Sequence, residues 1–510
     1  MYRYNDGVTG LLWRATVAVH RYFGMAVGVL MLMWFATGIV MIYVPYPQLS
    51  PAGHLASLAP VPSGTCCTPR ISRLADDELV VSVQVETLLG KPVARIRPDG
   101  RPPFHAALDG GPFEIDAATA HKIAVDAAPR IAGPAANIRS ADIIERDQWT
   151  VAEDYDSDRP LYRFSFDDGP GTQAYVSASS GEIVLWTTRA ERFWNWLGAV
   201  PHWLYFTQLR SDGPLWSKIV IGTSIAGAFL TVLGLYLGIA QFRRGPRLSP
   251  YRGWTFWHHL IGLSFGVLAL AWVVSGTISM NPWGFLEGGG GTERARLAGE
   301  PLSWNAYRAS LAKIGGKPEL AGMVSLASAP EAGELYWLAR WPGGKILRLD
   351  SDGNAAPVGS ADLVRAARVL ANGRRIKSAE MLRDEDSYYY RNASAGPLTL
   401  PAYRVILADA GHTRYYLDPR TSGLLGRVDS ARRGYRWLFD GLHRLDFFAW
   451  LRIRPLWDLI VLSLLLGGIA LTGTGFYLAL TRIKKDIGTV ARFLRRRSTG
   501  DAPATQPAAE

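Results

Sequence analysis

Cysteine is nearly absent from this chain: among 510 residues only two occur, Cys66 and Cys67. Two adjacent thiols give no ligand spacing for zinc and no framework of long-loop disulfides. They also exclude an iron–sulfur cluster held by four thiolates. The chain further lacks a GxSxG elbow, an HExxH helix, a Walker loop and a dinucleotide-binding glycine pattern in a suitable context. We expect the two cysteines to form a vicinal disulfide or to stay loosely structured, without a catalytic role.

Charged residues are also scarce, at 19% of the chain, whereas hydrophobic residues make up 48%. Four apolar runs are long enough to cross a bilayer, which takes about 20 helical residues. They lie at residues 17–44, 216–242, 257–281 and 457–481. The first run is too long for the apolar region of a cleaved signal peptide, so we interpret it as a retained membrane anchor.

The net charge of +11 is concentrated beside these runs. Basic residues precede the first run, fill the short connection between the second and third, and follow the fourth. They are Arg3, Arg14, Arg21, Arg243, Arg244, Arg247, Arg252, Arg482, Lys484, Lys485, Arg492, Arg495, Arg496 and Arg497. The positive-inside rule makes these segments cytoplasmic. Topology therefore explains the charge better than nucleic-acid binding does, and both termini are predicted inside the cell.

The chain repeats itself, and such self-similarity fixes which segments are equivalent. The stretch from Trp194 to Tyr236 recurs at an offset of 241, and matched positions include Trp196 with Trp437, His202 with His443, Pro214 with Pro455, Gly234 with Gly475 and Tyr236 with Tyr477. The first and third apolar runs match at an offset of 238, pairing His20 with His258, Gly24 with Gly262, Gly28 with Gly266, Trp34 with Trp272 and Gly38 with Gly276. Duplication is the simplest cause.

The unit helix, outer domain, helix is thus used twice. Because each unit has an even number of spans, both copies have the same orientation, and a pseudo-two-fold axis along the membrane normal relates them. We predict an α-helical membrane protein with four transmembrane helices from two parallel helix–periplasmic domain–helix repeats and two α+β periplasmic domains. The predicted division is 1–44 for the cytoplasmic N-terminus and first span, 45–213 for the first outer domain, 214–242 for the second span, 243–255 for a basic cytoplasmic loop, 256–282 for the third span, 283–455 for the second outer domain, 456–482 for the fourth span and 483–510 for a basic cytoplasmic tail that ends in disorder.

Histidines at the membrane are the candidate functional residues, because ionisable groups there are costly and mark function by default. His20 and His258 lie at the cytoplasmic ends of the first and third spans, and His202 and His443 lie outside, just ahead of the second and fourth. Equivalent residues face each other across a two-fold axis, and about 30 Å of hydrocarbon separates the inner from the outer histidines. The predicted pairs are therefore His20 with His258 and His202 with His443.

Two imidazoles on opposite sides of a flat macrocycle are the axial ligands of an electron-transfer haem. We therefore predict two haem b groups, one in each leaflet, with these four histidines bound to iron. A transition-metal site is the alternative, since neutral imidazole also binds zinc, copper and iron. His259 has no counterpart and is interpreted as a hydrogen-bonding residue, although its use in place of His258 stays open. The remaining histidines are interpreted as surface residues: His54, His105, His121 and His412.

Arginines and tryptophans flank the outer histidines. Arg210, Arg452 and Arg454 are candidates for holding haem propionates or an anionic substrate, or for anchoring helix ends. We interpret the tryptophans mainly as an aromatic belt at the membrane surface. Some of them are also candidates for lining the binding site of an outer haem. The tryptophans of this belt are Trp194, Trp196, Trp203, Trp216, Trp437, Trp450 and Trp457.

The first span HRYFG…TG, the third span HHLIG…SG, and the paired outer strands YRFSF and YRVIL resemble the PepSY-associated transmembrane family. Its members include iron-regulated inner-membrane proteins and periplasmic ferric-siderophore reductases. The resemblance covers roughly residues 10–485. It implies a four-helix membrane core with two PepSY-like periplasmic domains in the bacterial inner membrane. It also implies haem-mediated electron transfer to a periplasmic ferric-siderophore or other iron chelate, which releases iron as Fe(II).

In some relatives, a flavin- or nicotinamide-binding reductase region follows the last span. This chain shows only a basic helix and a tail there, so the expected electron donor is a separate cytoplasmic reductase or membrane quinol. Two rival functions fit the same architecture: a non-redox PepSY protein that binds or regulates periplasmic peptidases, and a transporter or transporter accessory protein. Only the redox function requires all four histidines.

Overall fold

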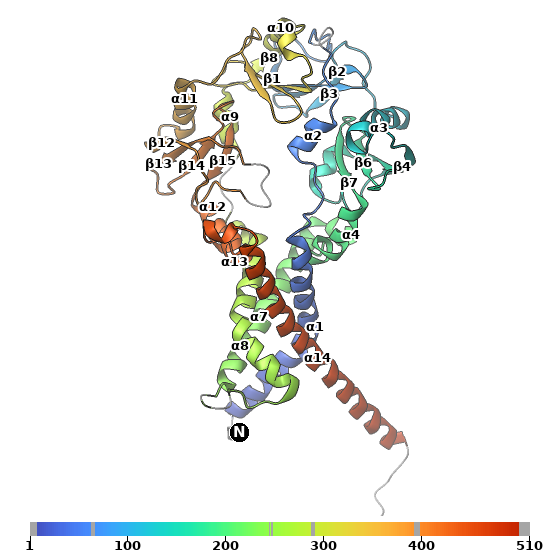
Figure 1. The fold of residues 1–510 in the computed structure, drawn as a ribbon, viewed down its shortest axis with the longest axis vertical. Helices are drawn as coiled ribbons and strands as arrows, with labels where there is room; N and C mark the ends of the chain where they lie inside the picture. The colour runs from blue at the N-terminus through green and yellow to red at the C-terminus, as the bar shows by residue number, and fades with distance from the viewer. Residues whose placement is uncertain are drawn as a thin grey trace, which may run out of the picture.

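The computed structural model describes residues 8–62, 67–243, 245, 248–286, 291–391 and 398–498. Several sequence predictions fall outside the described residues: those on Arg3, Cys66, Arg244, Arg247 and the tail from residue 499. Within the described part, long helices form a bundle at one end and β-sheets form a head at the other (Figure 1). The head consists of two arms joined by a third sheet at the end farthest from the bundle.

The bundle contains α1 (Val8–Met41), α7 (Gly213–Gln241), α8 (Gly253–Ser279) and α14 (Leu456–Ser498). All four are long and apolar enough to cross a membrane, which confirms the predicted number and location of candidate spans. Met31, Phe35 and Trp272 are buried between the helices. Val267 and Leu459 point outward and are 67% and 63% exposed. Helices that are apolar on their outer as well as their inner face are typical of membrane spans or of the core of a large protein.

Each arm is a four-stranded antiparallel sheet covered by one helix. The first arm has the order β4-β5-β6-β7 and the second β12-β13-β14-β15, so each sheet follows the chain. The first is built from β4 (Ile138–Ile144), β5 (Leu161–Phe166), β6 (Gln173–Ser177) and β7 (Ile183–Thr187) with α3 (Ala117–Ile131). The second is built from β12 (Ile376–Leu382), β13 (Ala402–Leu407), β14 (Arg414–Leu417) and β15 (Leu424–Val428) with α11 (Ser360–Ala371). These arms confirm the prediction of separate β-sheet domains.

The third sheet takes strands from both halves of the chain, which the sequence analysis did not anticipate. Its path is β11-β10-β9-β1-β2-β3, with β8 paired to β1. The strands are β1 (Leu79–Leu88), β2 (Lys91–Pro98), β3 (Phe104–Ala107), β8 (Leu302–Ser303), β9 (Ser325–Ser328), β10 (Trp337–Arg340) and β11 (Ile346–Leu349). The halves meet where β1 pairs with β9 in antiparallel register, with Val85 opposite Leu326. Helix α10 (Trp304–Ile314) adds Trp304 and Tyr307 to the core of this shared sheet.

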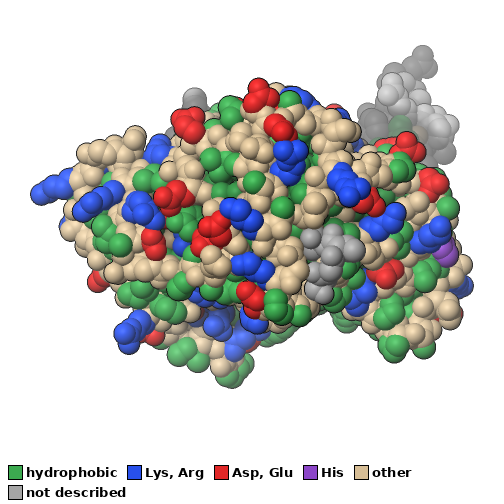
Figure 2. All heavy atoms as spheres, turned by 90° about the horizontal axis from the view of Figure 1, so that it is seen from above, with side chains coloured by type: hydrophobic (Ala, Val, Ile, Leu, Met, Phe, Trp, Pro, Cys, Tyr) green, Lys and Arg blue, Asp and Glu red, His purple; other side chains and the backbone are tan. Residues whose placement is uncertain are grey.

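Short helices connect these parts. They are α2 (Pro51–Ser57), α4 (Arg189–Leu197), α5 (Ala199–His202), α6 (Thr207–Arg210), α9 (Thr292–Ala298), α12 (Ser430–Tyr435), α13 (Leu442–Arg444), the π-helix Arg436–Gly441 and the 3-10 turns Glu153–Asp158, Pro282–Gly284, Pro318–Leu320 and Ala449–Arg452. Figure 2 views the molecule from above and shows acidic and basic side chains interspersed over that face. A surface of mixed charge suits water, in contrast to the apolar flanks of the bundle.

Candidate functional site

The structure brings the four predicted histidines together as two pairs. His20 on α1 lies beside His258 on α8, with ring centroids 6.4 Å apart. His202 at the end of α5 lies beside His443 on α13, also with ring centroids 6.4 Å apart. Thr37, the α1 residue that contacts His202, lies seventeen positions after His20. At 1.5 Å per helical residue the two pairs are about 25 Å apart along the bundle, so cross-pairing between them is excluded.

The outer pair is held by the same contacts in both halves. His202 Nδ1 lies 3.1 Å from the Trp34 carbonyl and 3.0 Å from Thr37 Oγ1. His443 Nδ1 has the corresponding partners, the Trp272 carbonyl at 3.2 Å and Ser275 Oγ at 3.1 Å. A carbonyl oxygen only accepts, so each Nδ1 carries the proton and donates it. This fixes the tautomer in which Nε2 has a free lone pair.

Burial keeps the outer imidazoles neutral. It lowers the pKa of His202 to about 4. The pKa of His443 falls to about 3, through burial first and then through the neighbouring His202. The neutral ring is the form that binds a metal. Phe439 stacks on the His443 ring at 5.1 Å, whereas the position that the repeat matches to Phe439 is Gly198, so the pair is not fully symmetric.

The loops that present the outer histidines are tied to the spans. Asp212 caps α7 by accepting a hydrogen bond from the Leu215 amide, and Pro214 occupies the first turn. Trp216 near the start of α7 donates its indole N–H to the Trp203 carbonyl at 2.8 Å. Its repeat counterpart Trp457 on α14 donates to the Arg444 carbonyl at 2.9 Å. Each indole therefore anchors the residue that follows a histidine, a role beyond the membrane belt predicted for these tryptophans.

The inner pair sits against glycines of the neighbouring spans. A Cβ atom placed on Gly234 of α7 would lie 2.8 Å from His20 Cε1, and one on Gly475 of α14 would lie 3.0 Å from His258 Cε1. Only residues without a side chain leave room for the rings. His258 Nδ1 lies 3.2 Å from the Leu471 carbonyl and from Thr474 Oγ1.

His20 lacks this support. Its Nδ1 is directed toward the Leu230 carbonyl but lies outside hydrogen-bond geometry and has no partner among the described residues. The repeat matches Thr474 to Leu233, so the hydroxyl that contacts His258 has no counterpart for His20. The two rings of the inner pair are therefore held differently.

The geometry fits two ligands of one metal. No hydrogen bond to Nε2 of these four rings occurs among the described residues, so each Nε2 is available. Metal–imidazole bonds are about 2.0–2.1 Å long, so two imidazoles that bind one metal ion through Nε2 would have ring centroids about 6 Å apart. The observed 6.4 Å agrees in both pairs. A backbone carbonyl on Nδ1 is the usual outer partner of a ligating histidine.

Protein side chains alone would leave such a metal incompletely coordinated. Across the described ranges, no group of three or more His, Cys, Asp or Glu side chains is placed to hold a metal ion. Each pair thus offers two ligands, and the rest must come from another molecule. A haem group would supply the remaining ligands through its porphyrin, and the two histidines of each pair would hold its iron. The donor set fits haem, whereas a zinc or copper ion would find only two protein ligands at each pair among the described residues.

His259 does not face the inner pair. Its Nδ1 lies 2.8 Å from Ser249 Oγ and its Nε2 lies 2.8 Å from the Gly238 carbonyl. With both ring nitrogens engaged, it ties α8 to the end of α7 and to the connection between them, in agreement with its interpretation as a hydrogen-bonding residue. It offers no lone pair in place of His258.

The other histidines lie in the head. His54 Nε2 is 3.3 Å from Glu86, and His105 Nε2 is 3.7 Å from Glu182. Both glutamates line a pocket between the first arm and the shared sheet with about 610 Å³ of empty space, part of it open solvent. These two histidines are partly buried rather than solvated surface residues. His121 is exposed, and His412 occupies a turn with φ of 43°.

The arginines near the outer pair are already engaged with carboxylates. Arg210 lies 3.4 Å from Glu153, and Arg454 lies 3.1 Å from Asp458. Arg452 lies 2.5 Å from Asp446 and also contacts Glu385 at 3.3 Å. Holding a propionate or an anionic substrate would require these ion pairs to open. Of the predicted belt, Trp194, Trp196, Trp203, Trp437 and Trp450 are exposed at the junction of bundle and head.

Sequence reasoning missed the residues that support the histidines. Thr37 and Ser275 hold the outer rings, and Gly234 and Gly475 make room for the inner rings. A signal was present for each. Gly234 and Gly475 are matched in the 241-residue repeat, while Thr37 and Ser275 precede the matched glycines that end the first and third apolar runs. A residue conserved between repeats has a shared structural task, and here the task is to position an imidazole.

Comparison with known proteins gives one family. Residues 17–348 match the model of a family described as the PepSY-associated TM region. The matched segment runs from α1 through the first arm, α7 and α8 to β11 of the shared sheet. No curated protein matches the chain.

Proposed function

The chain belongs to the family of the PepSY-associated TM region, and we propose that it is a di-haem reductase of the bacterial inner membrane. In this proposal electrons enter on the cytoplasmic side and leave to a ferric-siderophore or other ferric chelate in the periplasm. The observation that carries the proposal is the occurrence of two equivalent histidine pairs at opposite ends of one bundle, each with the ring separation of a bis-imidazole metal site.

The orientation follows from charge. Arg14 and Arg21 lie near the start of α1, Arg243 and Arg252 flank the connection from α7 to α8, and further basic residues follow the fourth span. Basic residues beside spans favour the cytoplasmic side. The His20–His258 pair is then cytoplasmic, and the His202–His443 pair faces the periplasm together with the head. Both described ends of the chain point into the cytoplasm.

The residues of the bundle hold and separate the two sites. The carbonyls of Trp34 and Trp272 fix the outer rings, and the Leu471 carbonyl fixes the ring of His258. Haem bound at each pair would supply reversible one-electron chemistry at iron. Between the pairs, Phe35 and Trp272 pack with ring centroids 5.7 Å apart in the buried core. Apolar, buried side chains thus fill part of the interval between the two sites.

The reaction transfers one electron to each ferric ion. Fe(III) in the chelate becomes Fe(II), a softer ion that hard oxygen donors hold less tightly. The electron originates from a membrane quinol or from a separate cytoplasmic reductase. Electron transfer would require no proton at His202, His443 or His258, because their Nδ1 protons are held by backbone carbonyls while Nε2 would bind the iron.

The test is the absorption spectrum of protein purified from haem-replete cells. We expect a reducible b-type spectrum with about two haems per chain, and oxidation of the reduced protein by a ferric chelate. Replacement of His202 or His443 by alanine should remove one haem, and replacement of His20 or His258 should remove the other. The matched control His121→Ala alters an exposed histidine of the first arm and should leave both haems in place.

A colourless protein would contradict the proposal. So would variants of the four histidines that support full growth on a ferric chelate. In that case the family membership would stand, and binding or regulation of periplasmic peptidases, or assistance to a transporter, would be the function to examine.

A further inference from the structure

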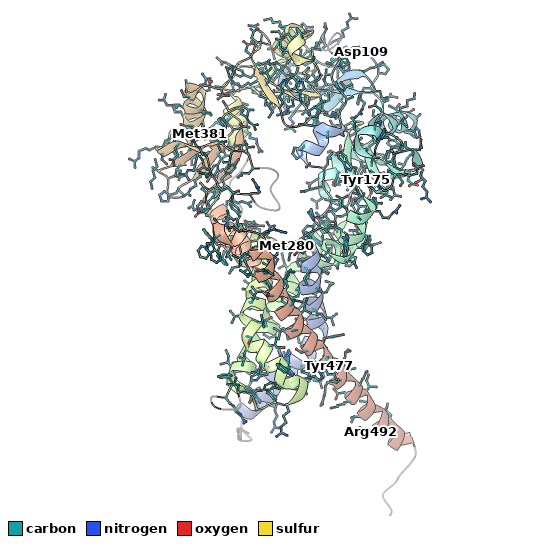
Figure 3. The ribbon with its side chains drawn as sticks, in the orientation of Figure 1. Asp109, Tyr175, Met280, Met381, Tyr477 and Arg492 are labelled. Carbon is teal, nitrogen blue, oxygen red and sulfur yellow. The ribbon has the colours of Figure 1, made fainter. Side chains whose placement is uncertain are left out.

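The last helix continues well past the bundle. Helix α14 runs for 43 residues, and Figure 3 shows its end, where Arg492 is labelled, standing away from the other helices. Its last hydrogen bond to another described helix joins Asp486 to the hydroxyl of Tyr22 on α1 at 3.3 Å. From residue 487 to residue 492 the polar contacts found among the described residues stay within α14. Within the described ranges, no hydrogen bond or ion pair joins residues 487–492 to another element of the fold.

The projecting segment carries an apolar stripe. Ile483, Ile487, Val490 and Leu494 follow the spacing i, i+4, i+7, i+11, which keeps them within an arc of about 60° at 3.6 residues per turn. Ile487, Val490 and Leu494 are 63%, 57% and 58% exposed. The stripe continues the lipid-facing side of the span through Leu480, which is 41% exposed. Apolar side chains are therefore presented beyond the end of the bundle, where water would otherwise surround them.

The opposite face is basic. Lys484, Lys485 and Arg492 lie roughly 100–200° around the helix from the stripe. Arg495, Arg496 and Arg497 follow in the sequence, whereas Asp486 is the one acidic residue between Arg482 and Ser498. Asp486 is itself paired with Arg482 at 3.0 Å. Among the described side chains, Lys484, Lys485 and Arg492 form no ion pair, so this face of the segment is positively charged.

We propose that residues 483–498 of α14 form an interfacial helix that binds the anionic phospholipids of the cytoplasmic leaflet. The apolar stripe enters the boundary between headgroups and acyl chains, and the basic face binds phosphate groups. Amphipathic helices with this division lie in the membrane surface, and four to eight basic residues directly after a span bind anionic lipid. Figure 1 shows α14 leaving the bundle obliquely, so its end reaches sideways from the bundle.

Continuity with the span favours lipid over a protein partner. The stripe is an extension of a surface that already contacts acyl chains, and the charge complements a leaflet that is negative along its whole extent. A docking face for a soluble protein would be expected to present aromatic or mixed polar groups, whereas the described face of this segment is aliphatic on one side and basic on the other. The proposal is independent of haem.

The experiment uses the full-length protein in lipid nanodiscs. A fluorophore sensitive to polarity is attached at Val490→Cys without reductant, since the described chain has no free cysteine. Nanodiscs of neutral phosphatidylcholine are compared with nanodiscs that contain phosphatidylglycerol. We expect a blue shift and a several-fold fall in quenching by acrylamide with the anionic lipid, both reversed by high salt. A matched label at Val125→Cys, 52% exposed on α3 of the head, should not respond.

The charge is tested with the variant K484E/K485E/R492E. We expect it to lose the response of the Val490 label to anionic lipid while its two haems and its head remain unchanged. Equal accessibility of the label in neutral and anionic nanodiscs would overturn the proposal. Protection that arises only when a soluble cytoplasmic fraction is added would overturn it as well, in favour of a protein partner. Haem content is measured on the same samples, so failure of the proposed function is recognised separately.

Discussion

Replacement of Gly234 by alanine tests whether the bundle is shaped around the inner histidines. The added Cβ would lie 2.8 Å from His20 Cε1, and ordinary contacts begin at 3.4 Å. The ring or the helix must therefore move by at least about 0.6 Å, which at buried sites costs about 1–3 kcal/mol. His20 Nδ1 lacks a hydrogen bond that would oppose displacement. We expect His20 to lose its ligand geometry before α7 moves.

The assay is the ratio of haem to protein with the reduced absorption spectrum. We expect G234A to fall from about two haems per chain toward one, or to show altered spin state and potential of the inner haem. Three matched variants separate this from a general effect. At Gly222 of α7 a Cβ meets nothing within 4 Å, so G222A should retain both haems. At Gly38 and Gly276 a Cβ would lie 3.7 Å and 3.6 Å from His202 and His443, so alanine there should be tolerated.

The reasoning would be refuted by G234A protein with two haems and an unchanged spectrum and potential, provided that His20→Ala removes a haem. That result would show that His20 binds iron but that Gly234 does not confine it. Loss of haem in G222A to the same extent would also refute it, because the effect would then come from the helix and not from the contact.

Three further predictions concern the outer pair and the head. Thr37→Val removes the hydroxyl beside His202 but keeps the Trp34 carbonyl, so we expect the outer haem to stay bound with a shifted midpoint potential in redox titration. The control Thr223→Val loses only a hydroxyl that is bonded within its own helix, so it should not shift the potential. Burial lowers the pKa of His54, but the hydrogen bond and charge of Glu86 outweigh burial, so the pKa is raised overall. The pair therefore stabilises the head below the ordinary histidine pKa, and this stabilisation is lost as pH rises through the raised pKa. His54→Gln should reduce the difference in unfolding free energy between pH 6 and pH 9 by about 0.5–1 kcal/mol. An unchanged difference in thermal or denaturant unfolding would contradict this. Trp337→Ala leaves a cavity in the core of the shared sheet and should destabilise the head by about 3–5 kcal/mol. We expect limited proteolysis to cleave both halves of the head together. Cleavage of the second half alone would show that the sheet does not couple the two halves.

Much of the membrane part was predictable, because its determinants are local. Span length and apolar composition place α1, α7, α8 and α14 without reference to the rest of the chain. The boundaries moved by a few residues where capping groups decide them, as at Asp212 and Pro214 at the start of α7. Helix α14 continues beyond the predicted span because nothing in its basic segment breaks a helix.

The shared sheet was not predictable by the same means. Strands β1 and β9 lie 245 residues apart where Val83 meets Ser328, and no local pattern states which distant edge a strand will pair with. The sequence of each strand is equally compatible with pairing inside its own half of the chain and with pairing across the two halves. Only the packing of Trp304 and Trp337 with residues of β1 and β2 in one core shows that the two halves close over each other.

The histidine site, too, was predictable from the sequence only in part. Duplication determined from sequence alone that His20 corresponds to His258 and His202 to His443, and the charge pattern separated an inner from an outer pair. The role of the four residues as haem ligands stays a prediction. The tertiary structure decided the 6.4 Å separation of the rings, the carbonyls that occupy Nδ1, and the glycines that leave room for His20 and His258. Repeats record which positions are equivalent, whereas distances across a symmetry axis depend on how four helices pack, and packing is a property of the whole bundle.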